Sequence, residues 1–520
     1  MIRSRAPPSY GIAPTFVNGD ICHDWRTSVV LEVPLRDIIM LLESTVIGQP
    51  VVETGNDPVE KKVNTQATGL PLAQGMSLSY WLQGVRNNPL LDHRSTETLP
   101  ATADIVIIGS GITGSLAALR LLESPNPPTS VVVLEARELC SAATGRNAGH
   151  CKPDQYRGFA KYKAEHGEEQ ALKQETWEKL TAFVKDEGVD CDLCIAKTVG
   201  HGQASCPDDQ IDVHMTEKLA AEAAAVFQAY KKAGGKVDHI TVIEDAKEAE
   251  RSTYAWDAAT LYPWKLVAHI TQKALALGLN LQTWTPVTGV VESTKAGQWT
   301  VKTARGDITT PTVVHATNAY AGYLLPEVKG SIRPTPHMCN KVIPPTSFSG
   351  SKGLKNSYAV VYPGGMFSVN PRANSDGIVL VGGSNPNNYK LLDYVAEDPT
   401  RRTDDSLTDF EPVTDAVKDL TQHGFGCSAV QARYDYAWSG IIGRSADSVP
   451  FVGAVPGRPG QWMCAGHNGH GMARIFTVAP ALVKLMQGAS WSDIGIPECF
   501  QVTKERLDKW REATLPAYAA

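Results

Sequence analysis

The feature that most constrains this chain is an apolar run that leads into three closely spaced glycines. Residues 104–108 read Asp-Ile-Val-Ile-Ile, and Gly109-Ser-Gly111-Ile-Thr-Gly114 follows directly. The next residues, Leu116–Leu122, are rich in alanine and leucine, which is typical of a helix. In such a unit Gly109 permits a tight turn, Gly111 lets the backbone approach a pyrophosphate, and Gly114 lets the helix pack closely against the strand. The run therefore predicts a strand–turn–helix unit suited to a dinucleotide.

A second strand and a terminal acid strengthen this prediction. The apolar residues Val131–Leu134 end in Glu135, about 20 residues beyond the glycines, where a carboxylate accepts hydrogen bonds from ribose hydroxyls. The helix N-terminus adds free N–H groups and the positive end of the helix dipole, and both favour phosphate. A glycine motif alone is weak evidence, but strand, helix, second strand and acid in this order predict a dinucleotide site. Its predicted contacts so far are Gly109, Ser110, Gly111, Ile112, Thr113, Gly114 and Glu135.

The loop after Glu135 helps to identify the dinucleotide. It runs Ala136-Arg137 and then Ser141-Ala-Ala-Thr144-Gly-Arg146-Asn147-Ala148-Gly149-His150. Enzymes that bind NAD in a similar unit do not need such a loop of small residues at this place.

Two later segments add to this pattern. Pro263–Leu277 predicts a helix and Leu281–Val291 a strand, and residues 299–320 predict a hairpin with a returning strand. Near the end, Tyr436–Gly453 leads to the glycine cluster Gly466–Met472, and an apolar helix is predicted over Ala473–Met486.

These motifs, in this order, resemble the D-amino-acid oxidase superfamily of FAD-dependent oxidoreductases over roughly residues 100 to 490. The likeness is greatest to the branch with glycine oxidase, monomeric sarcosine oxidase and gamma-glutamylputrescine oxidase. It implies an α/β fold: a Rossmann-type FAD-binding domain of glutathione-reductase-like topology, with an α+β insert that forms a discontinuous, mixed-sheet substrate domain. The further FAD contacts that it implies are Ala136, Arg137, Thr144, Arg146, Asn147, Ala148, Val287, Gly466, Gly469, Gly471 and Met472.

The expected domains are discontinuous. The FAD-binding domain takes residues 101–160, 255–335 and 436–490, and the substrate domain takes 161–254 and 336–435. Residues 1–75 are expected to be a peripheral or poorly ordered extension, 76–100 a lead-in segment, and 491–520 a C-terminal tail. Within the substrate domain we expect helices over Glu168–Lys185 and Thr216–Lys232, and a solvent loop over Glu397–Pro412.

The resemblance implies oxidation of a C–N bond in an amine or amino-acid-like substrate. Hydride passes to flavin N5, the imine is hydrolysed, and dioxygen reoxidises the flavin and becomes hydrogen peroxide. A pathway-specific dehydrogenase or tailoring oxidase of a non-amine metabolite stays open as the alternative. The candidate catalytic residues are Lys341, His470, Trp438 and Arg333, and the wider substrate-side set adds His337, Tyr362, His467 and Arg474.

The chemical types of the residues suggest partners for the substrate, for dioxygen and for the flavin. A substrate carboxylate favours an arginine fork, for which Arg333 and Arg474 are the candidates, and a cation such as Lys341 or His470 would help dioxygen to accept an electron. FAD is expected to bind noncovalently. Some members of the superfamily bind flavin covalently through His or Cys, so His150, Cys151, Cys339 and Cys464 are conceivable anchors.

Composition excludes other classes of partner. With 49 basic and 55 acidic residues the net charge is −6, and no long basic run is present, so nucleic acid is not expected as a partner. No window approaches the roughly 18 apolar residues that cross a bilayer. No secretory signal or peroxisomal tripeptide is evident, so we expect a cytoplasmic enzyme. We expect no metal site.

Overall fold

The computed structural model describes residues 69–154, 156–174, 177–195, 209–214, 217–243, 253–385, 387–424 and 430–511. Residues Gln66–Ala520 form one compact unit, and the account below concerns the described part of it. Most of the extension predicted for residues 1–75 thus lies outside the described residues.

A six-stranded sheet contains the predicted dinucleotide unit. Its strand order is β19-β20-β13-β1-β2-β9, and every neighbouring pair is parallel except β19–β20. The strands are β1 (Ile105–Ile108), β2 (Val131–Leu134), β9 (Asn280–Gln282), β13 (Thr312–His315), β19 (Phe451–Ala454) and β20 (Gln461–Ala465). They come from all three segments predicted for the FAD-binding domain.

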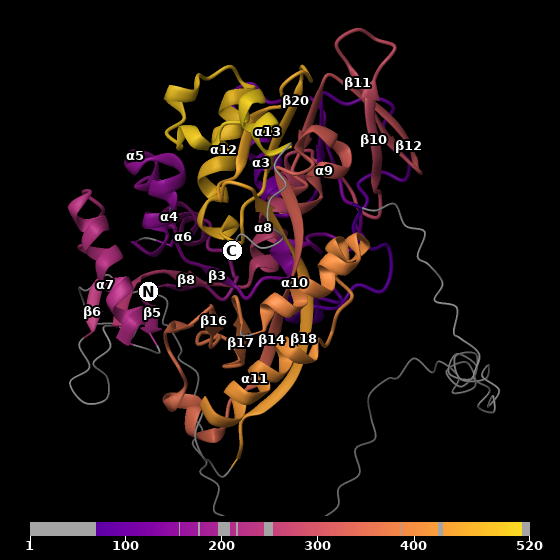
Figure 1. Cartoon of the computed structure of the whole chain (residues 1–520). Coiled ribbons are helices and arrows are strands. Elements are labelled where there is room, and N and C mark those ends of the chain that lie inside the picture. Colours follow the sequence, from indigo (N-terminus) through magenta and orange to yellow (C-terminus); the bar gives the residue numbers. More distant parts are fainter. Residues whose placement is uncertain are drawn as a thin grey trace, which may run out of the picture. The chain divides into compact units, whose positions relative to one another are not determined.

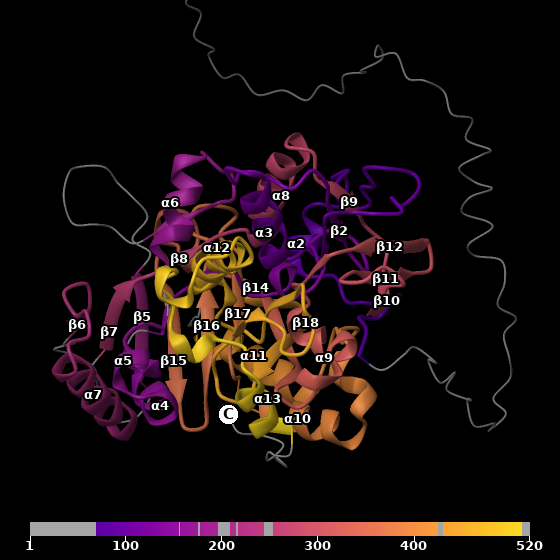
Figure 2. The same cartoon turned by 90° about the horizontal axis from the view of Figure 1, so that it is seen from above.

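Alternate residues of β1 enter different cores, which explains the unbroken apolar run. Ile105 and Ile107 pack in the core that includes α3 (Ile112–Leu122), α8 (Pro263–Ala276) and α12 (Ile475–Met486). Val106 and Ile108 pack instead against the antiparallel meander β10 (Val287–Glu292), β11 (Trp299–Thr303) and β12 (Gly306–Thr310). A parallel sheet covered on both faces needs apolar residues at every position. The helices and the meander are labelled in Figures 1 and 2. The predicted α/β fold class is confirmed.

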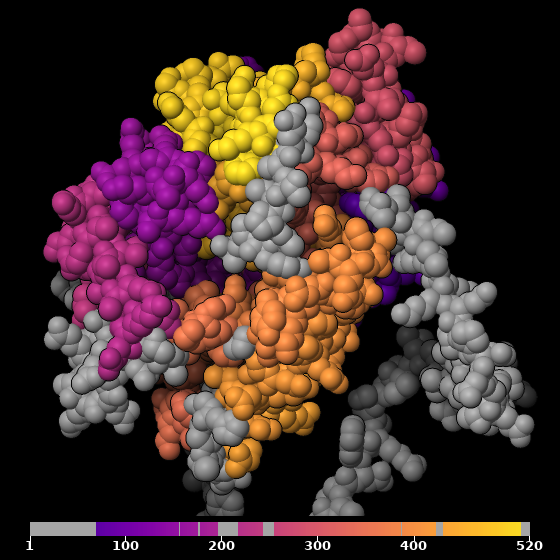
Figure 3. Space-filling model, viewed as in Figure 1, coloured from indigo at the N-terminus to yellow at the C-terminus, as the bar shows by residue number. Residues whose placement is uncertain are grey.

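An eight-stranded mixed sheet forms the second layer, in the order β18-β14-β17-β16-β15-β5-β7-β6. Its strands are β5 (Asp209–His214), β6 (Thr241–Ile243), β7 (Thr253–Asp257), β14 (Ile332–Ile343), β15 (Ser357–Tyr362), β16 (Gly365–Asn370), β17 (Val379–Gly382) and β18 (Arg433–Ser445). Helices α10 (Asn388–Glu397) and α11 (Glu411–Gly424) pack on β14 and β18. The segment that contains these two helices, orange in Figure 3, forms the molecular surface over β14 and β18.

The long antiparallel pair β14–β18 brings distant segments into register. His337 lies opposite Gly440, and Arg333 lies opposite Arg444. Residues directly opposite each other share a face of the sheet. The pair therefore places alternate residues of both strands on one face.

The remaining elements are a small sheet and further helices. A small sheet joins β3 (His150–Cys151), β4 (Cys194–Ile195) and β8 (Ala259–Thr260), and the other helices are α2 (Tyr80–Gln83), α4 (Tyr156–His166), α5 (Glu168–Ala171), α6 (Glu178–Asp186), α7 (Glu217–Lys232), α9 (Ala321–Leu324) and α13 (Lys504–Arg511). The helix predicted over Glu168–Lys185 is thus two helices, α5 and α6, whereas α7 agrees with its prediction except for Thr216, which lies outside the described residues.

The single strand predicted over Leu281–Val291 is wrong, because the chain leaves the sheet between β9 and β10. Trp284 adopts φ +51°, and its N–H donates to the carbonyl of Arg137 at 2.9 Å. The N–H of Thr285 donates to the carbonyl of Glu135 at 2.7 Å. The detour therefore places the start of β10 beside the loop that follows β2.

Two expectations about surface position fail at particular residues. Asp405, in the supposed solvent loop Glu397–Pro412, is fully buried, because its carboxylate pairs with Arg137. Leu70 and Pro71, expected in a peripheral extension, line the main cavity.

Candidate functional site

The main cavity lies at the carboxyl ends of β1 and β2, where open α/β sheets bind their ligands. It encloses about 390 Å³, within the range of cofactor and substrate sites. Its wall combines the β1–α3 turn, the loop 142–148, parts of β14 and β18, and the glycine cluster 467–473. One continuous cavity thus joins the cofactor-domain sheet to the eight-stranded sheet.

The three glycines of the β1–α3 turn have separate structural reasons. Gly109 adopts φ +106°, and a Cβ there would lie 2.7 Å from the carbonyl oxygen of Ala316. A Cβ on Gly114 would lie 1.9 Å from the carbonyl oxygen of Gly109, so the helix could not approach the strand. Gly111 is the N-cap of α3 and lines the cavity, with only the Thr144 hydroxyl near its Cβ position, at 3.4 Å. The geometry matches the reasons inferred from the sequence.

Glu135 is held at the end of β2 by hydrogen bonds to its carboxylate. Oε2 accepts from the N–H of Ser110 at 2.9 Å and from its hydroxyl at 2.7 Å, and Oε1 accepts from the N–H of Arg137 at 3.0 Å. These bonds fix the carboxylate against the glycine turn while Glu135 lines the cavity. Its position fits a ribose contact.

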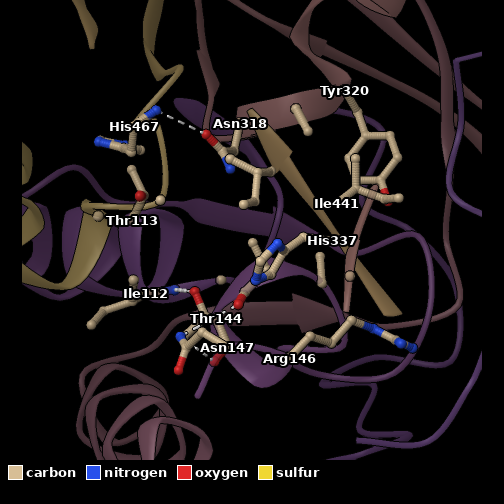
Figure 4. Close-up of a pocket in the computed structure, with 18 of the residues that line it drawn as sticks. Ile112, Thr113, Thr144, Arg146, Asn147, Asn318, Tyr320, His337, Ile441 and His467 are labelled. Carbon is tan, nitrogen blue, oxygen red and sulfur yellow. Dashed lines mark hydrogen bonds between the residues drawn. The ribbon is translucent and has the colours of Figure 1, made fainter. Parts of the chain in front are cut away.

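The loop after β2 presents its backbone and short side chains to the cavity. Thr144 Oγ1 accepts from the N–H of Ile112 at 3.3 Å, which ties the loop to the start of α3. The guanidinium of Arg146 points away from His337, as Figure 4 shows, and donates to the carbonyl oxygens of Ser141 at 2.6 Å and Ser439 at 2.8 Å. Arg146 therefore contributes to the wall of the cavity, while its buried guanidinium points away from the cavity.

The glycine cluster is anchored by one asparagine. Asn318, at φ +42°, accepts through Oδ1 from the N–H groups of Gly466 at 3.0 Å and His467 at 3.3 Å, and Figure 4 shows the second of these bonds. The cluster ends in a 3-10 turn, Gly471–Ala473, before α12 begins at Ile475. The predicted helix start at Ala473 is therefore two residues early.

Three histidines in the wall are neutral near pH 7. Burial, with the nearby charge of Arg444, lowers the pKa of His337 to about 4. Burial lowers the pKa of His467 to about 3 and that of His150 well below its usual range. Neutral imidazoles can accept as well as donate a hydrogen bond. In Figure 4 the ring of His337 points into the space between Thr144 and Asn318.

His470 differs because it has a carboxylate neighbour. Its Nε2 lies 3.5 Å from Oδ2 of Asp154. Burial alone would raise the pKa of Asp154, but the charges of His470, Arg157 and Arg474 outweigh burial and lower it. Asp154 is therefore an anion that orients His470 at the cavity wall.

Several buried polar atoms in the wall have no hydrogen-bond partner among the described residues. They are Thr317 Oγ1, Tyr320 Oη, His150 Nε2 and His467 Nδ1. Buried polar atoms in native proteins are nearly always paired. A large polar ligand would supply the missing partners, so the wall fits a dinucleotide as well as the glycine turn does.

Most predicted cofactor contacts meet in this cavity. Those that line it are Gly109, Gly111, Ile112, Thr113, Glu135, Ala136, Arg137, Thr144, Arg146, Asn147, Ala148, Val287, Gly469, Gly471 and Met472. Ser110, Gly114 and Gly466 do not line it; they support the turn, the helix packing and the glycine cluster. The cofactor contacts themselves stay predictions.

Of the four candidate catalytic residues, only His470 lines the cavity. Lys341 pairs with Asp435 at 2.9 Å. Trp438 is fully buried and donates from Nε1 to the carbonyl of Arg146 at 2.7 Å. Arg333 shares the face of Arg444 but is not part of the lining. We therefore propose no direct catalytic role for these three.

The wider candidates divide in the same way. His337, His467, His150 and Cys339 line the cavity, whereas Tyr362, Arg474, Cys151 and Cys464 do not. The guanidinium of Arg474 donates to the hydroxyl of Tyr162 at 2.8 Å, and the Tyr362 hydroxyl donates to the carbonyl of Ser384.

Two cations in the lining were not predicted as site residues. Arg444 was noted only as part of the Tyr436–Gly453 motif, and Lys152 follows the small-residue loop. Arg444 lies at alternate positions with Gly440 and Ile442 in the sequence, and alternate residues of a strand share a face. This spacing is the signal that could have identified Arg444.

Comparisons with known proteins agree with this geometry. The model of the DAO family, described as FAD dependent oxidoreductase, matches residues 104–485. A probable oxidoreductase, OrdL, of Haemophilus influenzae is 24% identical over 392 residues, which cover 71% of this chain and 80% of the relative. No helix in the described part of this chain has the length and apolarity needed to cross a membrane.

Solved structures share the fold at low identity. L-Amino acid deaminase from Proteus myxofaciens, in complex with anthranilate, has a TM-score of 0.58 at 16% identity, covering 82% of this chain and 97% of its own. Glycine oxidase from Geobacillus kaustophilus has a TM-score of 0.52 at 18% identity, covering 78% and 99%.

Proposed function

Because the chain belongs to the DAO family of FAD-dependent oxidoreductases, we propose that it oxidises a C–N bond of an amine or amino-acid-like substrate. The supporting observation is that one cavity runs from the dinucleotide turn to the β14–β18 wall, so cofactor and substrate can share it. The structural neighbours glycine oxidase and L-amino acid deaminase are named for substrates of this type.

Several of the chain's own residues would hold FAD. The start of α3, with Gly111 as its N-cap, offers N–H groups to the diphosphate. The carboxylate of Glu135 is a candidate partner for the adenosine ribose, and the hydroxyls of Thr317 and Tyr320, which have no partner within the described part of the chain, lie in the same wall. Asn318 holds the first two N–H groups of the glycine cluster, and Gly469, Gly471 and Met472 of the same cluster line the cavity, where their N–H groups would be donors for the flavin ring.

The chemistry divides between cofactor and protein. When bound, FAD supplies the electron acceptor: a hydride leaves the carbon beside the amine nitrogen, water hydrolyses the resulting imine, and dioxygen takes up the two electrons as hydrogen peroxide. On the protein side, His337 is neutral and can accept a hydrogen bond from the substrate amine. His470, oriented by Asp154, places a second polar group at the wall.

An anaerobic reduction experiment tests this function. The purified yellow holoprotein is mixed with amino acids, N-methyl amino acids and polyamines, and the visible flavin absorbance is followed. We expect one class of amine to bleach the flavin, and hydrogen peroxide to form when air is admitted. If no amine bleaches a flavin that dithionite still reduces, C–N oxidation of these classes is excluded. Bleaching without peroxide would retain C–N oxidation but assign the electrons to another acceptor.

A further inference from the structure

We propose that residues 69–81, here called the covering segment, form part of the cofactor site and control the release of FAD. The covering segment precedes residue 104, where the match to the DAO family begins, and the sequence patterns predicted no cofactor contact in it. The inference rests on the proposed function only in that FAD occupies the main cavity. It goes beyond that function because it assigns cofactor retention to a segment outside the family match.

The start of the covering segment lies in the wall of the main cavity. Leu70 and Pro71 line the cavity. Gly69 adopts φ +111°, and a Cβ there would lie 3.2 Å from the ring of Tyr323, which also lines the cavity. Tyr323 packs on the core cluster that contains Val287, a predicted FAD contact in the same wall. The covering segment thus closes the cavity at a place where FAD is expected.

The later part of the covering segment packs against the loop after β2. The hydroxyl of Ser79 donates to the carbonyl of Gly145 at 2.5 Å, and Nε1 of Trp81 donates to the carbonyl of Asn147 at 2.5 Å. A Cβ on Gly149 would lie 2.8 Å from the ring of Trp81, so no space separates the two segments there. Because Asn147 lines the cavity, Trp81 directly supports a residue of the cavity wall.

Ser77 joins the covering segment to both sheets. Its hydroxyl accepts from Nη1 of Arg146 at 3.1 Å and from the N–H of Ser439 on β18 at 3.1 Å. The same hydroxyl donates to the carbonyl of Asp405 at 2.8 Å. Ser77 is buried, and a buried polar group that loses its partner is costly. Displacement of the covering segment would therefore leave several buried groups without partners.

These contacts fix the cofactor loop before the cofactor binds. Three successive loop residues, Gly145, Arg146 and Asn147, each bond to a different residue of the covering segment. A loop that is already held in its binding conformation loses less entropy when the ligand binds, so it binds more tightly. Differences in affinity within one site appear mainly in the dissociation rate. The covering segment should therefore slow the release of FAD.

The first test measures that release. The holoprotein is diluted, free FAD is separated by ultrafiltration at intervals, and the absorbance of the filtrate gives the dissociation rate. Leu70→Ala should release FAD about threefold to tenfold faster than the wild type, because the cavity wall loses apolar contact. The matched control is Leu78→Ala in the same segment, where the leucine is 39% exposed. It should release FAD at the wild-type rate.

The second test uses the wild-type protein, so it does not depend on whether a variant folds. Amide hydrogen exchange of residues 69–81 is compared in the apoprotein and the holoprotein. If the covering segment stabilises bound FAD, then bound FAD must stabilise the covering segment to the same extent. We expect slower exchange in the holoprotein over residues 69–81 and 142–148. Helix α7, none of whose residues lines the main cavity, should change less.

Three results would overturn the inference. The first is equal release of FAD from Leu70→Ala and from either the wild type or Leu78→Ala. The second is exchange of the covering segment that does not respond to FAD. The third is FAD that stays with the denatured protein, because a covalent bond would then retain it.

Neither test uses a substrate, so the inference and the proposed function can fail separately. If no amine reduces the flavin but Leu70→Ala releases FAD faster, C–N oxidation fails and the role of the covering segment stands. If amines reduce the flavin but Leu70→Ala retains FAD as the wild type does, C–N oxidation stands and the role of the covering segment is wrong.

Discussion

At the residue scale, the glycine turn shows that one motif can contain different kinds of constraint. Gly114 has no room for a side chain, since its Cβ would overlap a backbone carbonyl, whereas the Cβ position on Gly111 has only ordinary contact with Thr144. A backbone atom cannot move aside as a flexible side chain can. Gly114 is therefore required for folding, and Gly111 for the approach of the ligand.

The two substitutions should separate these roles. Gly114→Ala should lower the free energy of unfolding by about 2 kcal/mol or more, because overpacking forces α3 away from β1. Gly111→Ala should cost at most about 1 kcal/mol, the usual effect of losing an N-cap glycine, but should weaken FAD binding. Denaturant unfolding of the apoprotein and FAD titration measure the two effects. Equal losses of stability in both variants would contradict this division.

At the element scale, the pairing of β13 with β20 buries a titratable group between two strands. His315 is fully buried, and its Nε2 lies 2.9 Å from Oε1 of Gln461. Burial lowers the pKa of His315 to about 4 from its ordinary value of 6.5. The folded state therefore binds fewer protons than the unfolded state between these two pH values, and its stability rises with pH across that window.

Acidification from pH 6.5 to pH 4 should therefore destabilise the protein through His315 by up to about 3 kcal/mol. In His315→Gln the slope of unfolding free energy against pH should fall by up to about 1.4 kcal/mol per pH unit in this window. Denaturant unfolding of the apoprotein at several pH values measures the slope. An unaltered slope in His315→Gln would show that other groups cause the acid sensitivity.

At the scale of the whole described unit, a buried ionic network joins three distant segments around the cavity. The carboxylate of Asp405 lies 2.9 Å from Arg137 and 3.3 Å from Arg146, and its carbonyl oxygen accepts from the hydroxyl of Ser77 at 2.8 Å. The segment that contains Ser77 also places Leu70 at the cavity wall. The network therefore ties this lead-in segment and the Asp405 loop to the loop after β2.

Asp405→Asn should be strongly destabilising, because it leaves two buried guanidinium groups without their anion. Removal of one partner from a buried ion pair typically costs about 3–5 kcal/mol. Thermal unfolding of the holoprotein measures the loss, and FAD should dissociate at lower temperature as the wall loosens. Asp398→Asn, at a solvent-accessible position earlier in the same segment, is the control and should change stability much less. A similar effect of both variants would argue against the network.

The sequence by itself determined the dinucleotide unit, the α/β class and the family. Gly109, Gly111, Gly114 and Glu135 could be interpreted because turn geometry and strand periodicity depend on residues close together in the chain. The same holds for α7 and α8, whose bounds agree closely with the predictions.

Only the tertiary structure decided which charged side chains face the cavity. Lys341, Arg333 and Arg444 are of one chemical type, but only Arg444 lines the cavity, because the register of β14 and β18 positions the three differently along one face. The burial of Asp405 likewise depends on arginines more than 250 positions away. Pairing between segments so distant depends on how whole elements pack against each other, and local sequence patterns contain no record of it.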